Sequence, residues 1–88
     1  MGYHIPGLRK RGDRHEDAFR EVREELQEAS LKFGAFNSAH EGYAVMLEEV
    51  EELWDEIKVK QSLRSKEQIR CEAKQVAAMA IRIMIDCT

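Results

Sequence analysis

Long apolar runs, proline and glycine are scarce in this chain. No stretch of about twenty apolar residues occurs in its 88 residues, so the sequence predicts no transmembrane helix. One proline and five glycines leave few turn-forming positions, which argues against a sheet-rich fold. The first residues lack the apolar core of a secretory signal. We therefore expect an all-α protein located in the cytoplasm.

Cysteine is scarce as well. The two cysteines, Cys71 and Cys87, fall in one expected helix, where they stand about 24 Å apart at the usual rise per residue. That separation is far beyond the reach of a disulfide. We expect both to be reduced thiols that pack as small hydrophobic side chains, which fits a reducing compartment.

The charge balance is mildly acidic, with a formal net charge of -3. Nucleic acid is therefore not the expected partner, because its phosphates attract basic proteins. The one basic run, Arg9-Lys10-Arg11, lies within residues 1–12, a segment without hydrophobic periodicity. Short basic arms of this kind are usually solvated chain ends. We expect a flexible basic tail over residues 1–12 and one helical domain over residues 13–88.

Three capping patterns predict where the helices begin. In each, a short polar residue is followed three residues later by Glu or Gln, so both side chains can bond the first free backbone N–H groups. The three pairs are Asp13 with Glu16, Ser38 with Glu41, and Ser65 with Gln68. The first helix is expected to stop at Gly34, the second at about Lys60, and the third close to the end of the chain.

Apolar residues mark the faces that these helices bury. In the first helix they follow a heptad-like rhythm that is typical of a helix in a bundle. These residues are Phe19, Val22, Leu26, Ala29 and Phe33. We expect Phe33, and Trp54 of the second helix, to pack in the core.

The third helix is apolar around almost its whole circumference from Val76 to Ile85, with Arg82 as the interruption. A helix that is apolar all round must be covered all round. Three helices in one small chain cannot surround it, so a second copy should. We expect a three-helix protomer that forms a helical bundle with a second copy, as a homodimer or a homotetramer.

Carboxylates gather on one face of the second helix. At about 100° per residue they share roughly a third of its circumference. They are Glu48, Glu49, Glu52, Asp55 and Glu56. Lysines, Lys58 and Lys60, appear only where the helix ends, so the acids repel one another unless a hard cation holds them.

A further carboxylate, Glu72, lies beside the apolar stripe of the third helix. An unpaired carboxylate there is costly, so a metal or an arginine must neutralise it unless it is exposed. Magnesium prefers a few carboxylates together with water and phosphate oxygens. Glu48, Glu49, Glu52 and Glu72 together are therefore a candidate magnesium cluster across two helices.

These residues resemble a known family. The string Glu48-Glu49-x-x-Glu52, a later Glu72-x-x-Gln75 and the helical length are similar to the MazG-like, all-α nucleoside triphosphate pyrophosphohydrolases, and to their compact bacterial and phage branch. That family holds magnesium with EExxE followed by ExxD. The resemblance covers residues 15–86 and implies a MazG-like helical domain over residues 13–88.

The resemblance also implies an activity. A house-cleaning hydrolase of this family cleaves a nucleoside triphosphate to the monophosphate and pyrophosphate, with Mg²⁺, or alternatively Mn²⁺, as cofactor. The implied metal ligands are Glu48, Glu49, Glu52, Glu72 and Gln75. Glu48, if it is not itself a ligand, is the expected catalytic base that takes a proton from water.

Gln75 departs from the family pattern, since the matching position is an aspartate. Its amide oxygen can bind a metal but carries no charge, which weakens affinity. Three interpretations remain open: a working site with an amide ligand, a site completed by Glu56 or Asp55, or a retained fold with lost activity. The last is a catalytically silent helical oligomer that binds a nucleotide or a protein partner. Asp86 lies roughly 16 Å further along the helix and does not obviously replace the ligand.

Substrate contacts are expected around the linker between the first two helices. Phe36 can stack on a base, Asn37 can bond its edge, and His40 lies close by. Lys74 and Arg82 can balance the charge of the leaving pyrophosphate. Each has a plainer interpretation: Phe36 as a hydrophobic staple, His40 as a surface residue, and the whole acidic face as solvated surface.

Overall fold

The computed structural model describes residues 11–88 and contains three α-helices in that range. They are α1 (Arg11–Phe33), α2 (Ala39–Ile57) and α3 (Lys66–Asp86), with a short 3-10 helix, η1 (Gln61–Leu63), before α3. No strand occurs among the described residues, which confirms the all-α prediction. None of the described helices is long and apolar enough to cross a membrane. Most of the predicted basic tail, residues 1–10, lies outside the described range.

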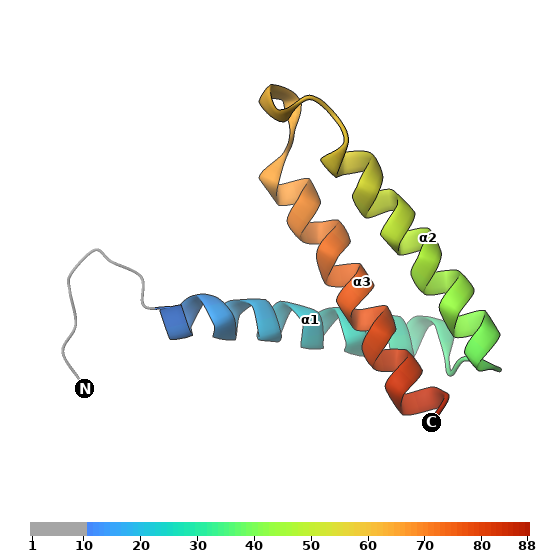
Figure 1. The fold of residues 1–88 in the computed structure, drawn as a ribbon. Coiled ribbons are helices and arrows are strands. Elements are labelled where there is room, and N and C mark those ends of the chain that lie inside the picture. The colour runs from blue at the N-terminus through green and yellow to red at the C-terminus, as the bar shows by residue number, and fades with distance from the viewer. Residues whose placement is uncertain (1–10) are drawn as a thin grey trace.

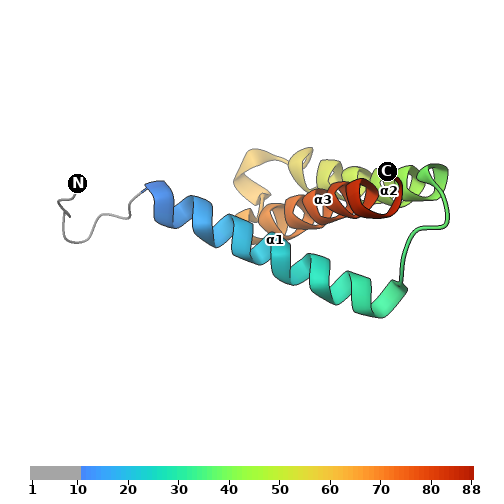
Figure 2. The ribbon, with the colours of Figure 1, turned by 90° about the horizontal axis from the view of Figure 1, so that it is seen from below.

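α2 and α3 form an antiparallel hairpin, and α1 crosses it (Figure 1). Seen from below, α1 runs in a separate layer beneath the pair (Figure 2). α3 contacts both other helices. It is therefore the central element on which the rest of the described chain packs.

Two of the three predicted caps are present. Ser38 Oγ accepts the Glu41 N–H at 3.1 Å, and Ser65 Oγ accepts the Gln68 N–H at 3.0 Å. The return bond from Glu41 goes to the Asn37 N–H at 2.6 Å. The two serine bonds satisfy donors that the first turn of a helix leaves free.

Two predicted helix ends are shifted. α1 begins at Arg11, two residues before the predicted start, so Asp13 lies within its first turn, where its charge favours the helix dipole. α2 ends at Ile57 instead of about Lys60, because the Lys58 N–H closes the last turn onto the Trp54 carbonyl and the chain then turns into η1.

The core is small and lies where α1 crosses α3. Ala29, Ala78 and Met79 are buried, and Ala78 is fully covered. Partly buried apolar side chains pack around them: Val22, Leu26, Phe36, Val45 and Met46. Small residues at the crossing let the two helices approach closely, but no large side chain in residues 13–88 is fully buried.

Phe33 and Trp54 were predicted to lie in the core, and both predictions are wrong for the single chain. Phe33 is 68% exposed and Trp54 is 57% exposed. Phe33 is the last residue of α1, beyond the crossing with α3, where the chain leaves the helix at Gly34. Met84 and Ile85 of α3 are also exposed, so one chain does not cover the apolar circumference of that helix.

The connection between α1 and α2 is fastened to the end of α3. Gly34 adopts φ +70°, a left-handed conformation that glycine reaches without a Cβ clash. Asp86 Oδ2 accepts the Phe36 N–H at 3.0 Å, and Arg82 Nη2 donates to the Gly34 carbonyl. A Cβ at Gly42 would lie 2.8 Å from Ile83 Cγ1, so glycine permits the close approach of α2 to α3 there.

Candidate metal centre and adjoining pocket

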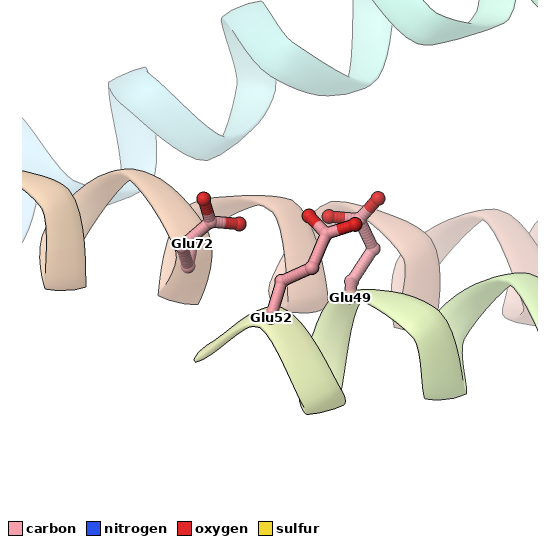
Figure 3. A group of neighbouring side chains, drawn as sticks. All are labelled: Glu49, Glu52 and Glu72. Carbon is pink, nitrogen blue, oxygen red and sulfur yellow. The ribbon is translucent and has the colours of Figure 1, made fainter. Parts of the chain in front are cut away.

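Three carboxylates from two helices converge on one point. Glu49 and Glu52 are three residues apart on α2 and therefore share a face, and Glu72 reaches them from the neighbouring α3 (Figure 3). One oxygen from each lies within 4.8 Å of the others. We call this group the acidic cluster. It contains three of the four carboxylates that the sequence grouped as a candidate magnesium cluster, and Glu48 is not among them.

Two oxygens of the acidic cluster are buried and unpaired. Glu49 Oε2 and Glu72 Oε1 are shielded from solvent and have no hydrogen-bond partner. The other oxygen of Glu72 accepts the Gln68 side-chain amide at 3.0 Å. In residues 13–88 no lysine or arginine forms an ion pair with any of the three acids. A buried acceptor without a donor is costly, so these oxygens suit a cation.

The surroundings of two of these acids raise their pKa values. The pKa of Glu49 is raised above its ordinary value, first by burial and then by the charges of Glu52 and Glu72. The pKa of Glu52 is also raised, by local desolvation and then by the charge of Glu72, although its side chain is largely exposed. Mutual repulsion within the acidic cluster therefore opposes the fully charged state.

The dimensions of the acidic cluster fit a small divalent cation. Magnesium binds oxygens in a near-octahedral shell, in which neighbouring oxygens are about 3 Å apart and opposite ones about 4.2 Å apart. One oxygen from each of the three acids lies within 4.8 Å of the others, a separation of the same order as these. Carboxylate oxygens with no competing cation are also the donors that magnesium prefers.

The other residues predicted to bind the metal lie differently. Glu48 is exposed, and its charge contributes to the raised pKa of both Glu49 and Glu52. Gln75 is half-buried, and its amide donates to Cys71 Sγ at 3.8 Å. Gln75 thus has a contact that the sequence did not indicate.

Of the acids weighed as a substitute ligand, Asp55 instead pairs with Lys58 at 3.0 Å. Asp86 is engaged with the Phe36 backbone at the far end of α3. Glu56, the other acid weighed, also lies outside the acidic cluster, so none of the three supplies the charge that Gln75 lacks.

Sequence reasoning missed Glu25 of α1. Its negative charge is among the causes of the raised pKa of Glu49, and Lys74 Nζ lies 3.9 Å from its Oε1. Lys74 was predicted to contact the substrate, but in the structure its ammonium group lies next to Glu25 of α1. The available signal was the position of Glu25 next to Leu26, at the border of the apolar stripe.

A pocket of about 440 Å³ adjoins the acidic cluster, and we call it the loop pocket. The α1–α2 connection, α2 and Arg82 of α3 form its walls. Its apolar lining residues are Phe33, Ala35, Phe36 and Val45, and its polar ones are Asn37, Glu41, Glu48, Glu49 and Arg82. Glu49 belongs both to the pocket and to the acidic cluster, so the pocket and the cluster adjoin at this residue.

The loop pocket gathers three of the five predicted substrate contacts: Phe36, Asn37 and Arg82. His40 is exposed and does not line it. Phe33, which sequence reasoning placed in the core, lines the pocket instead.

Arg82 is a buried cation, only 3% exposed. Its guanidinium lies 4.1 Å from the centre of the Phe36 ring, Nη1 contacts Met79 Sδ at 3.9 Å, and Nε has no hydrogen-bond partner. No carboxylate in residues 13–88 forms an ion pair with it. Its charge is stabilised mainly by the aromatic ring and by the Gly34 carbonyl.

Comparison with known proteins identifies no relative. No family model, no curated protein and no solved structure matches this chain. The function is therefore argued from the acidic cluster and the loop pocket themselves.

Proposed function

We propose that this protein is a magnesium-dependent nucleoside triphosphate pyrophosphohydrolase of the MazG-like, house-cleaning type. The observation that carries the proposal is the pair of buried, unpaired carboxylate oxygens, Glu49 Oε2 and Glu72 Oε1, on neighbouring helices. They lie in a group of three acids beside a pocket large enough for a nucleoside. A divalent cation gives these oxygens the partner that no described side chain supplies.

The four acids have two roles in this reaction: three hold the ion and one is the base. Glu49, Glu52 and Glu72 would hold the ion, which when bound neutralises phosphate oxygens and orients a water molecule. Glu48 directly precedes Glu49 on α2, is exposed, and also lines the loop pocket. It takes the proton of the water as the water's oxygen bonds to the α-phosphorus and the bond to pyrophosphate breaks.

The nucleoside occupies the loop pocket. The Phe36 ring offers a surface for a base, and the Asn37 amide offers hydrogen bonds to it. Since Glu49 belongs to both spaces, a base in the pocket leaves the phosphates directed toward the acidic cluster. With the base in the loop pocket and the phosphates at the acidic cluster, the bond to be cleaved lies next to the ion.

We also propose that the protein acts as a homodimer, or a tetramer built from dimers, in the cytoplasm. Its radius of gyration, 15.9 Å, exceeds the value of about 12 Å expected for a compact domain of this length. Two apolar grooves of about 380 and 390 Å³ run between α1 and α3. A second copy would cover them. The free thiols of Cys71 and Cys87 favour a reducing compartment.

Pyrophosphate release tests the hydrolase directly. Purified protein is incubated with Mg²⁺ and a panel of canonical and modified triphosphates, and products are identified by phosphorus NMR. We expect monophosphate and pyrophosphate, and a loss of at least about 100-fold in Glu49→Gln and Glu72→Gln. Release from no triphosphate, with wild type and Glu49→Gln alike, removes the proposal.

Glu51→Gln is the matched control, because Glu51 is exposed on α2 and lies outside the acidic cluster. It should keep wild-type activity. Glu48→Gln separates the base from the ligands: it should slow turnover while leaving the Mg²⁺ affinity close to that of wild type.

Gln75 favours a second candidate, a catalytically silent helical oligomer that binds a nucleotide or a protein partner. A glutamine stands where the family pattern has an aspartate, so the fourth carboxylate is missing, and its amide donates to Cys71 Sγ. Calorimetric titration with Mg²⁺ or Mn²⁺ separates the candidates. Millimolar or tighter binding that Glu52→Ala abolishes supports the hydrolase, whereas no binding supports the silent oligomer.

A further inference from the structure

We propose that the loop pocket selects guanine, with Arg82 donating hydrogen bonds to O6 and N7 of the base. The inference deepens the proposed function, and it rests on that function in placing a nucleotide beside the acidic cluster. It starts from a cation that the fold buries without a counter-ion.

Arg82 lines the loop pocket, yet its side chain is only 3% exposed. It forms no ion pair in the described part of the chain. The Phe36 ring covers one face of the guanidinium at 4.1 Å. The N–H groups lie in the plane of the guanidinium: Nη2 donates to the Gly34 carbonyl and Nη1 contacts Met79 Sδ. Nε–H has no acceptor at all, so a ligand in the pocket can supply one.

The charges of the pocket wall favour a neutral ligand group at Arg82. Three carboxylates, Glu41, Glu48 and Glu49, line the same space as this one guanidinium. A phosphate or carboxylate placed there would face more negative than positive charge. A neutral base edge that carries acceptors avoids that repulsion and still satisfies the arginine.

Distance along α3 also separates Arg82 from the phosphate end. Ten residues divide Glu72 from Arg82, which is roughly 15 Å along a helix. A group that far from the acidic cluster suits the base end of a nucleotide better than the leaving pyrophosphate. The structure therefore favours base recognition over the charge-balancing role that the sequence suggested for Arg82.

Guanine matches both sides of the pocket. Its O6 and N7 are adjacent acceptors, the pair that arginine bonds most often in specific base recognition. Its remaining polar edge carries N–H donors, which the carboxylates Glu41 and Glu48 can accept. Adenine instead offers an amino donor beside N7, which would leave one N–H of the arginine facing another donor.

The residues that hold Arg82 make the site rigid. Arg82 Nη2 donates to the Gly34 carbonyl, and Asp86 holds the Phe36 N–H at 3.0 Å. The donor and the ring beneath it are thus fixed to the same loop before a ligand arrives. A donor placed in advance loses little freedom when it binds.

Binding of nucleoside monophosphates tests the inference without requiring hydrolysis. Affinities of GMP, 7-deaza-GMP, AMP and CMP are measured by calorimetry in the absence of a divalent ion. We expect GMP to bind at least about ten-fold more tightly than AMP, CMP and 7-deaza-GMP, which lacks the N7 acceptor. Equal affinities for GMP and 7-deaza-GMP, or no binding of GMP at millimolar concentration, would overturn the proposal.

A variant identifies the residue. Arg82→Met keeps the length of the side chain but removes the donors, and it should lose the preference for GMP, whereas Arg20→Met, an exposed arginine on α1, should keep it. A preference that survives Arg82→Met contradicts the assignment. If Arg82→Met does not fold, the comparison of GMP with 7-deaza-GMP on the wild-type protein decides.

The outcomes also separate this inference from the proposed function. Selective GMP binding without pyrophosphate release from GTP would retain the base pocket and reject the hydrolase. Release of pyrophosphate from every triphosphate at similar rates, with no guanine preference in binding, would retain the hydrolase and reject the role of Arg82.

Discussion

At the scale of single residues, the unusual groups are carboxylates that repel one another. Glu49 is half-buried, and Glu72 keeps one oxygen without a partner. A fold stabilised only by its own contacts would place a lysine or arginine among them. Leaving these carboxylates unpaired destabilises the fold, and proteins accept such a loss of stability mainly at functional sites.

The first prediction concerns pH. The pKa values of Glu49 and Glu52 are raised above the ordinary value of 4.5, so the folded state holds protons that the unfolded state has released. Their contribution to stability is therefore complete below pH 4.5 and is lost as the pH rises through the raised values. Metal-free Glu49→Gln should gain stability relative to wild type between pH 5 and neutral pH.

Thermal unfolding at several pH values, with the metal removed by a chelator, measures this difference. Glu51→Gln serves as the control and should follow wild type. Added Mg²⁺ should raise the melting temperature of wild type more than that of Glu49→Gln. A constant difference between wild type and Glu49→Gln across this pH range would contradict the prediction.

The second prediction concerns Gly34. Its φ of +70° disfavours an L side chain, although no atom lies within 4 Å of an added Cβ. Gly34→Ala should therefore lower the free energy of unfolding by about 1–2 kcal/mol through backbone strain alone. Gly34→Asn should cost less, since asparagine tolerates this conformation. Urea denaturation measures both, and equal costs would argue against backbone strain as the cause.

At the scale of helices, the sequence predicted much of what the structure contains. Ser38 and Ser65 cap the helices that their patterns announced, and Gly34 ends α1. These features depend on residues a few positions apart, so local chemistry is sufficient to predict them. Glu49 and Glu72 could also be paired, because an antiparallel hairpin brings their faces together.

What the sequence did not predict depends on how the helices cross. The exposure of Phe33 follows from α1 meeting α3 at small residues and then continuing past it, while Trp54 is exposed on α2, which no described element of the single chain covers there. The bond of Asp86 to Phe36 joins positions fifty residues apart. No periodicity within one helix contains that information, so the loop pocket could not be located from the pattern alone.

The third prediction concerns the contact of α2 with α3 at Gly42. An added Cβ would meet Ile83 Cγ1 at 2.8 Å and Phe36 Cδ2 at 3.1 Å. Although alanine favours a helix, Gly42→Ala should destabilise the protein by about 1–3 kcal/mol because the helices must separate. It should also weaken ligand binding in the loop pocket, whose Phe36 wall would shift.

Urea denaturation and GMP binding measure the two effects of Gly42→Ala. The cost should shrink in an Ile83→Ala background, where the conflicting side chain is gone. A gain in stability from Gly42→Ala in the wild-type background would show that the packing at this position is looser than described.

At the scale of the whole molecule, the described chain is open. Its dimensions are 48 × 36 × 19 Å, and its buried core amounts to a few small residues and Met79. Large apolar side chains remain exposed on α1 and α3. An isolated domain with so little buried surface has little to offset the entropy of its chain.

The fourth prediction follows from this openness. Phe19 is 62% exposed and lines an apolar groove with Ile81. Phe19→Lys should convert the proposed dimer to a monomer and lower its melting temperature, as measured by analytical ultracentrifugation and thermal unfolding. Leu63→Lys, an exposed apolar residue of η1 that lines neither α1–α3 groove, should leave the assembly intact. A wild-type protein that sediments as a monomer would contradict the assembly.

The acidic cluster joins α2 to α3, and α1 contributes none of its three residues. An ion bound there would link α2 to α3. Its binding should therefore slow deuterium uptake by the backbone amides of α2 and α3 more than by those of the first half of α1. The distance between α2 and α3 should then depend on ionic radius. Calcium binds oxygens at longer distances than magnesium, so it should draw the two helices together less closely.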